Sequence, residues 1–307
     1  MNKGKNMSPA YIRFISALIP DKTLRQQIRD VLFGRNDWEI RKKESEEAQF
    51  AKLLGRVRQQ NLHDYVRAYS KIGELLDILR PYRRIGAEKA RIGSGKDGGY
   101  AMLPPDSGDI AYSFGVSADS PWDLVMAEKG HQVFQYDGTI EAAPDSHPNI
   151  HFHRNNIASP SQNTPDTKTV GRIFDDLGHQ GKDNIILQID IEGAEWAVFE
   201  EISEEQIKQF KQIIIEWHGL SPFMEGFDRR LSILRKVAQT HTPIHVHINN
   251  YGYPRNAEQG LLFYGDAYEV SYVRSDDFEF EPDNAAYPTE LDAPCNPAWP
   301  DITIGKW

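Results

Sequence analysis

The sequence predicts an α/β fold, in which a doubly wound, Rossmann-like sheet of seven mostly parallel strands follows an N-terminal helical extension. Two observations predict the sheet. From about residue 91 onward, short apolar runs alternate with helical patterns, which is typical of parallel βαβ units. One run, IILQIDI at residues 185–191, is almost continuous in branched residues, as expected of a strand buried on both faces. The first ninety residues instead show helical periodicity.

The N-terminal region, residues 1–88, is predicted to be helical, amphipathic and basic. Apolar residues recur at helical spacing before Pro20 and again between Leu24 and Leu32. Residues 1–90 carry 19 Lys and Arg against 11 Asp and Glu, whereas the remainder of the chain carries 16 against 34. Residues 8–33 could therefore lie on anionic lipid, or pack their apolar face on the main domain or on a second subunit of a homo-oligomer.

The main domain, residues 89–307, is predicted to hold the sheet. Strands are expected at 110–114, 131–137, 149–154, 185–191, 212–217 and 244–248, with a terminal antiparallel pair at 261–264 and 269–274. Helices are expected between them at 120–129, 167–177, 194–202 and 228–240. The tail from Asp276 is acidic and rich in proline, so we expect it to be irregular and to cover the sheet edge or the site.

Composition narrows the classes of function. The single cysteine, Cys295, excludes an internal disulfide and a cysteine-rich zinc site. The sequence contains no membrane-spanning apolar run and no apolar core of a secretory signal near its start. We therefore expect a cytoplasmic protein, peripheral at the inner face of the membrane if residues 8–33 bind lipid. The acidic main domain argues against nucleic acid as a partner.

A nucleoside site is predicted at the carboxyl ends of the first two strands of the sheet, where open α/β sheets bind ligands. Gly115 follows the first strand and would let the backbone approach a ligand closely. Asp137 ends the second strand 22 residues later, a usual offset for a carboxylate that binds the hydroxyls of a ribose. The absence of further glycines after Gly115 disfavours a dinucleotide, whose pyrophosphate needs close backbone contact. A nucleoside without phosphates, such as S-adenosylmethionine, makes no such demand.

Candidate catalytic residues follow the next strands. Three carboxylates cluster at the end of the strand at 185–191 and just after it, namely Asp190, Glu192 and Glu195. Glu216 and His218 end the following strand, so His218 is our first candidate for a general base and His247 our second. Alternatively, Asp190, Glu216 and His218 could hold one divalent cation, for which oxygen-rich ligands favour magnesium or manganese.

Several motifs resemble a known family. The segment IDIEGAEW, residues 189–196, resembles the DxEGxE signature of FkbM-type S-adenosylmethionine-dependent methyltransferases. A larger set, covering about residues 88–300, is similar to the related methyltransferase-like proteins of animals. Its further elements are RIGSGKDGGY at 91–100, YSFGVSADSPWD at 112–123, VFQYDGTI at 133–140 and LDAPCNP at 291–297.

The resemblance implies a class I methyltransferase fold that binds S-adenosylmethionine. The implied cofactor contacts are Phe114, Gly115, Val116, Ser117, Asp137, Asn156 and Asp190, with Asp97, Gly98 and Tyr100 of the DGGY element near the cofactor or the acceptor. The expected reaction is O-methylation of a sugar or glycan hydroxyl in surface polysaccharide biosynthesis. His218 would be the base, and Asp190 or Glu192 would orient it or the acceptor. The alternatives are an NAD-linked sugar-modifying oxidoreductase and a non-catalytic module that binds a glycan or a protein partner.

Overall fold

The computed structural model describes residues 67, 70–222, 224–252 and 265–307. The chain divides into two compact units, one of residues 1–73 with 252–264 and one of residues 74–251 with 265–307. The larger unit contains the seven-stranded sheet and the helices α4 to α8 described below. The expected amphipathic segment 8–33 and the expected strand at 261–264 lie outside the described residues. Among those that are described, no helix combines the length and apolarity that crossing a bilayer requires.

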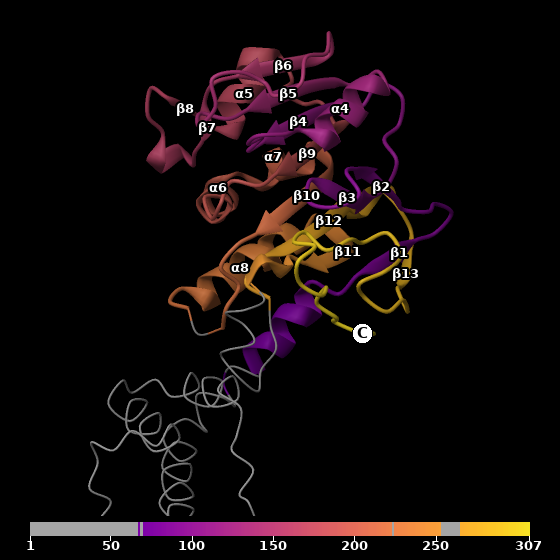
Figure 1. Ribbon diagram of the computed structural model, residues 1–307. Coiled ribbons are helices and arrows are strands. Elements are labelled where there is room, and N and C mark those ends of the chain that lie inside the picture. Colours follow the sequence, from indigo (N-terminus) through magenta and orange to yellow (C-terminus); the bar gives the residue numbers. More distant parts are fainter. Residues whose placement is uncertain (1–66, 68–69, 223, 253–264) are drawn as a thin grey trace, which may run out of the picture. The chain divides into compact units, whose positions relative to one another are not determined.

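The larger unit is built on a seven-stranded sheet with the order β11-β12-β10-β9-β4-β5-β6 (Figure 1). Its strands are β4 (Ile110–Phe114), β5 (Gln132–Tyr136), β6 (Ile150–His153), β9 (Ile185–Ile189), β10 (Phe210–Trp217), β11 (His241–Ile248) and β12 (Tyr268–Arg274). The seven-stranded α/β sheet that the sequence predicts is confirmed.

The sheet is mixed, and the expectation of a mostly parallel sheet is not confirmed. Strands β6, β5, β4, β9 and β10 pair in parallel, whereas β12 runs antiparallel to both of its neighbours, β10 and β11. The sequence pattern predicts an antiparallel course for residues 269–274, and β12 has it, but its neighbours are β10 and β11. Its position between them is not readable from the sequence, because a strand buried on both faces has the same apolar pattern whichever strands it pairs with.

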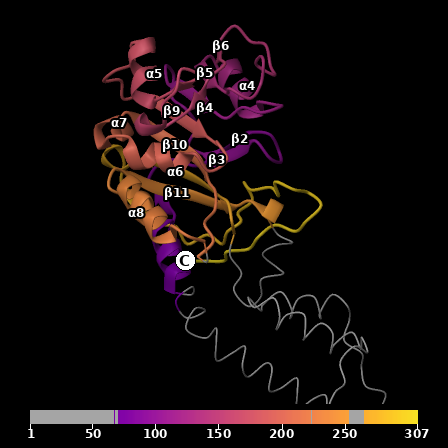
Figure 2. The same cartoon turned by 90° about the vertical axis from the view of Figure 1, so that its left-hand side faces the viewer.

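Helices cover both faces of this sheet, as a doubly wound fold requires. They are α4 (Pro121–Glu128), α5 (Val170–Leu177), α6 (Glu195–Glu201), α7 (Glu204–Lys208) and α8 (Phe227–Ala238). Figure 2 shows α4 on one face and α5 to α8 on the other. Local signals set their ends: Thr169 caps α5 by accepting a hydrogen bond from the Arg172 amide, and Gly178 ends it in the left-handed conformation.

Short elements that the sequence did not reveal complete the unit. They are β1 (Tyr82–Arg84), β2 (Ala90–Gly93), β3 (Gly99–Met102), β7 (Asn156–Ile157), β8 (Thr167–Lys168), β13 (Phe280–Pro282) and the 3₁₀ helices η1 (Pro160–Gln162), η2 (Asn250–Gly252) and η3 (Ser275–Asp277). The β2–β3 hairpin packs beside α4, and the two share a core with the sheet through Tyr100, Trp122 and Ile186. The hairpin thereby brings its connecting loop, residues 94–98, to the end of the sheet where ligands are expected.

Candidate active site

A cavity of about 580 Å³ opens at the carboxyl ends of β4, β5 and β9. Its volume falls within the ordinary range of small-molecule sites. It is lined by nine of the residues expected to contact the cofactor, namely Asp97, Gly98, Tyr100, Gly115, Val116, Ser117, Asp137, Asn156 and Asp190. Phe114, the tenth, lies behind them as a fully buried residue at the end of β4. The strand order thus brings together residues that are far apart in the sequence.

Gly115 makes the closest backbone approach at this end of the sheet. Its φ of 82° lies in the left-handed region, and a Cβ atom added there would lie 1.7 Å from the carbonyl oxygen of Asp190. The strand ends are held together by two backbone hydrogen bonds, from Gly115 to Tyr136 and from Asp190 to Phe114. Glycine is therefore required at this position both for its conformation and for space.

Asp137 anchors the loop that follows Gly115. Its Oδ2 accepts hydrogen bonds from the amides of Val116, at 2.9 Å, and Ser117, at 3.0 Å. Its Oδ1 accepts from the amide of Thr139, at 2.7 Å, and from the Thr139 hydroxyl, at 2.6 Å. Burial alone would raise the pKa of Asp137, but these four bonds outweigh it and lower the pKa. The carboxylate is ionised and holds the loop, while its contact with a ribose stays a prediction.

His218 is held at the ends of β9 and β10 among four carboxylates. Its Nδ1 lies 3.0 Å from Oε1 of Glu195, which also accepts the His218 backbone amide. Its Nε2 faces three carboxylate oxygens at 3.5–3.7 Å, those of Asp190, Glu192 and Glu216. Asp190 and Glu192 line the cavity, whereas His218 and Glu216 do not, so Nε2 of His218 faces the cavity across these two carboxylates. The sequence predicts that these residues lie at one edge of the sheet. It does not identify Glu195 as the group that orients the ring of His218.

The charges in this cluster shift one another's pKa values. Burial would lower the pKa of His218, but the hydrogen bond that it donates to Glu195 and the charges of Glu216 and Asp190 outweigh it and raise the pKa to about 9. Burial raises the pKa of Asp190 to about 7 and that of Glu216 well above its ordinary value. Asn249, which the sequence analysis did not place in the site, donates a 2.8 Å hydrogen bond to Glu216. These shifts bring the pKa values of Asp190 and His218 to within about two units of neutral pH, the range in which an acid–base site operates.

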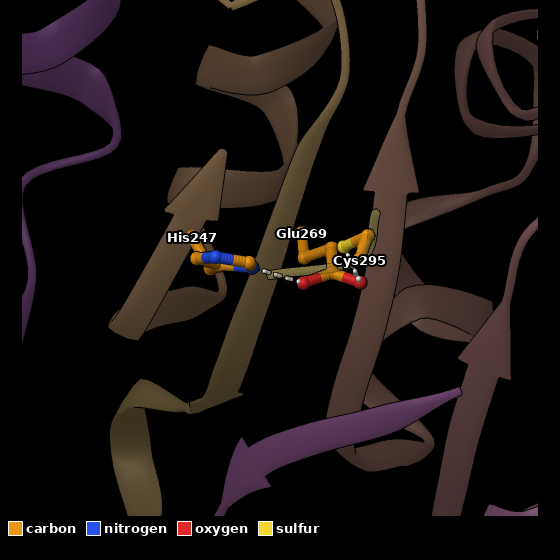
Figure 3. A group of neighbouring side chains, drawn as sticks. All are labelled: His247, Glu269 and Cys295. Carbon is orange, nitrogen blue, oxygen red and sulfur yellow. Dashed lines mark hydrogen bonds and ion pairs between the residues drawn. The ribbon is translucent and has the colours of Figure 1, made fainter. Parts of the chain in front are cut away.

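His247, the second candidate base, belongs to a different cluster (Figure 3). Its Nδ1 lies 2.6 Å from Oε2 of Glu269, and its Nε2 lies 3.0 Å from Oδ1 of Asp301. Burial would lower the pKa of His247, yet the bonds to these two carboxylates raise it. Both ring nitrogens of His247 lie within hydrogen-bonding distance of a carboxylate, whereas Nε2 of His218 has carboxylates only at 3.5–3.7 Å, so the geometry favours His218 over His247 as the base.

The C-terminal segment contributes part of the cavity wall, as expected for the proline-rich tail that begins at Asp276. Cys295 and Pro297, within the LDAPCNP motif, line the cavity. Burial raises the pKa of the Cys295 thiol to about 12, so the thiol is protonated and is no nucleophile at neutral pH. LDAPCNP is one of the motifs that carry the family resemblance, and this is the sequence signal that points to its place in the site.

Asp123 is a buried carboxyl group that lines the cavity, and its pKa leads to a prediction about stability. Asp123 is 4% exposed, its Oδ1 has no hydrogen-bond partner among the described residues, and burial raises its pKa to about 6. With an ordinary value of 3.8 in the unfolded chain, the ionised group costs about 3 kcal/mol above pH 6. The group therefore contributes stability below pH 3.8 that is lost as the pH rises through 6.

We expect Asp123→Asn to unfold at a higher temperature than the wild type at pH 8. The difference should shrink as the pH falls from 6 toward 4, because the wild-type carboxyl group then becomes neutral as well. Melting temperatures of both proteins across this range, without added ligand, check the prediction. A difference that does not change with pH would show that ionisation of Asp123 is not its cause.

Comparison with known proteins agrees with this architecture. Residues 87–254 match the model of a family described as the methyltransferase FkbM domain. Two curated relatives, both named probable methyltransferase-like protein 24, come from Homo sapiens and Rattus norvegicus. They are 29% identical over 137 and 135 residues, which is 40% of this chain and 36% and 37% of theirs. The chain thus spans little more than a third of the length of the relatives it matches.

Proposed function

The chain belongs to the FkbM methyltransferase domain family, and from this premise we propose that it transfers the methyl group of S-adenosylmethionine to a hydroxyl group of a sugar or glycan. The observation that carries the proposal is the position of His218. It is oriented by Glu195, and its second nitrogen faces two carboxylates that line the cavity beside the Gly115 loop. A cofactor cavity and an acid–base cluster therefore adjoin, as methyl transfer to a hydroxyl requires.

The residues of the cavity fit the proposed cofactor. Gly115, Val116 and Ser117 line the cavity, so the backbone of the loop after β4 borders the space that a ligand would occupy. Among the described lining residues, one lysine, Lys96, is outnumbered by six carboxyl groups, those of Asp97, Asp119, Asp123, Asp137, Asp190 and Glu192. This charge suits a sulfonium cation and opposes the pyrophosphate of NAD. The oxidoreductase alternative is therefore disfavoured by charge as well as by the glycine-poor loop.

The acceptor side performs the proton chemistry in this proposal. S-adenosylmethionine supplies a methyl group that is already activated, so the protein has to align the acceptor oxygen and remove its proton. Nε2 of His218 would accept that proton, while Glu195 fixes the ring through Nδ1. Asp190 and Glu192 would hold the acceptor or the ring in place. Because the pKa of His218 is raised to about 9, the neutral fraction that can act as a base increases with pH.

The same cluster supports the alternative role of a divalent cation. Ligand atoms of Asp190, Glu192 and His218 lie within 4.8 Å of one another, so Glu192 stands where the sequence analysis expected Glu216. A magnesium or manganese ion there would lower the pKa of the acceptor hydroxyl, and His218 would then be a ligand instead of a base. The two roles differ in their response to added metal.

Methyl transfer to a panel of acceptors tests the proposal. Full-length protein is incubated with methyl-labelled S-adenosylmethionine and with neutral glycosides, amino sugars and a protein extract, each with and without magnesium or manganese. We expect label on a glycoside oxygen at a rate that does not depend on metal. A rate that requires metal would assign the proton step to the cation. Label on nitrogen alone would overturn the proposal that the acceptor is a hydroxyl group. Cofactor binding without any transfer would favour the non-catalytic module.

The biosynthetic role and the cellular location of the reaction are proposed on the basis of a glycan acceptor. A glycan acceptor is consistent with a role in surface polysaccharide biosynthesis in the cytoplasm. Residues 8–33 would provide a peripheral contact at the inner face of the membrane if their basic amphipathic pattern binds lipid.

A further inference from the structure

The second cluster, formed by His247, Glu269 and Cys295, is not used by the proposed reaction. His247 on β11 and Glu269 on β12 are directly paired in the sheet, so their side chains project from the same face. Cys295 reaches them from the C-terminal segment, and the three side chains point toward one another (Figure 3). All three are buried, with 3%, 7% and 3% of their surface exposed.

The three side chains present three donors of different kinds at the spacing of metal ligands. One nitrogen, one carboxylate oxygen and one sulfur lie within 4.8 Å of one another. The Cys295 sulfur lies 3.6 Å from Oε1 of Glu269. Ligand atoms of a tetrahedral zinc ion lie roughly 3.3–3.7 Å apart, so this pair already has the required separation. Nδ1 of His247 and Oε2 of Glu269, now at 2.6 Å, would have to move apart.

Groups outside the cluster hold these donors in place. Asp301 contacts Nε2 of His247 with both oxygens, at 3.0 and 3.1 Å, which leaves Nδ1 directed at Glu269. A carboxylate on the far nitrogen is the usual partner of a histidine that binds zinc. Asn250 fixes the residue after Cys295, since it donates to the Asn296 carbonyl and accepts from the Asn296 amide. The donors are thus preorganised from both sides.

From this geometry we propose that His247, Glu269 and Cys295 bind a zinc ion. A thiolate, an imidazole and a carboxylate together suit zinc, whereas magnesium and manganese avoid sulfur. The ion replaces two protons, one on Nδ1 of His247 and one on the Cys295 sulfur, so the net charge of the buried group does not change. Three protein ligands leave a fourth position for water. Because Cys295 forms part of the cavity wall, the ion ties the LDAPCNP segment to the sheet at the edge of the site.

Metal binding by full-length protein without a histidine tag tests this proposal, independently of any turnover. Protein purified without chelators should contain about one zinc per chain by elemental analysis. Replacement of zinc by cobalt should give a thiolate-to-cobalt charge-transfer band in the near ultraviolet. Since Cys295 is the only cysteine of the chain, that band can arise from no other residue. A cobalt titration that gives no such band would overturn the proposal, as would chains that hold no zinc.

Variants separate this site from the His218 cluster. Cys295→Ser and Glu269→Gln should lose the bound zinc, whereas His218→Gln should keep it. Asp301→Asn should keep the stoichiometry but bind about 10- to 100-fold more weakly, because only the outer partner of His247 is lost. A chelator should lower the melting temperature of the wild type and leave that of Cys295→Ser unchanged. Equal zinc in wild type and Cys295→Ser would assign the ion elsewhere and contradict the proposal, and circular dichroism of each variant verifies that it is folded.

Discussion

Replacement of His218 by glutamine is expected to lower kcat by about 10²- to 10⁴-fold while the affinity for S-adenosylhomocysteine stays within about twofold. Glutamine keeps a hydrogen bond to Glu195 but cannot take a proton from the acceptor. The cavity is lined by other residues, so cofactor binding should be preserved. His151→Gln is a matched control, since this histidine lies on the edge strand β6 and does not line the cavity.

The pH dependence of the wild-type enzyme gives the same prediction a second readout. A base must be unprotonated, and the pKa of His218 is raised to about 9, so only about one molecule in a hundred carries the neutral ring at pH 7. We expect kcat/KM to rise about tenfold per pH unit and to level near pH 9. His218→Gln should abolish this rise. A variant that keeps the wild-type rate, or the same rise with pH, would remove His218 from the proton step.

Replacement of Gly115 by alanine should have the largest effect on cofactor binding. The added methyl group would lie 1.7 Å from the Asp190 carbonyl oxygen, and the left-handed conformation would be strained as well. The ends of β4 and β9 would have to separate. We expect the variant to lose about 2–4 kcal/mol of stability and to bind S-adenosylhomocysteine at least roughly 100-fold more weakly.

Gly130→Ala separates the clash from the backbone strain. Gly130 also has a positive φ, 93°, but a Cβ atom there would meet nothing within 4 Å. This control should lose only about 1–2 kcal/mol and should bind the cofactor as the wild type does. Calorimetric titration and thermal melts of both variants check the prediction. Equal cofactor affinity in Gly115→Ala and the wild type would show that the ligand does not lie at this loop.

The central part of the fold was readable from the sequence because its strands are buried. Branched apolar runs predicted β4 within its observed limits and β9, β10 and β12 within two residues at each end. The small sheets were missed for a physical reason. Strand β1 has three residues, YRR, and pairs with β13 two hundred positions later, so neither has a periodic pattern of its own. Tertiary pairing alone makes them strands.

The site was predictable to the extent that strand order determines it. Gly115, Asp137 and Asp190 each follow a strand, so parallel pairing brings them to one edge. Contacts that depend on the path of the C-terminal segment had no local signal. Asp301 reaches His247 and Cys295 reaches Glu269 across 54 and 26 positions, and these contacts determine that His247 is enclosed while His218 is not. The pKa of His218 likewise depends on Glu195 from a different element.

The central claim is that the cavity at the ends of β4, β5 and β9 binds S-adenosylmethionine. Isothermal titration of the full-length protein with S-adenosylhomocysteine and, separately, with NAD⁺ tests it most directly. We predict saturable binding of one S-adenosylhomocysteine per chain, strongly weakened in Gly115→Ala, and no heat from NAD⁺. Binding of NAD⁺, or no binding of S-adenosylhomocysteine by folded wild-type protein, would contradict it.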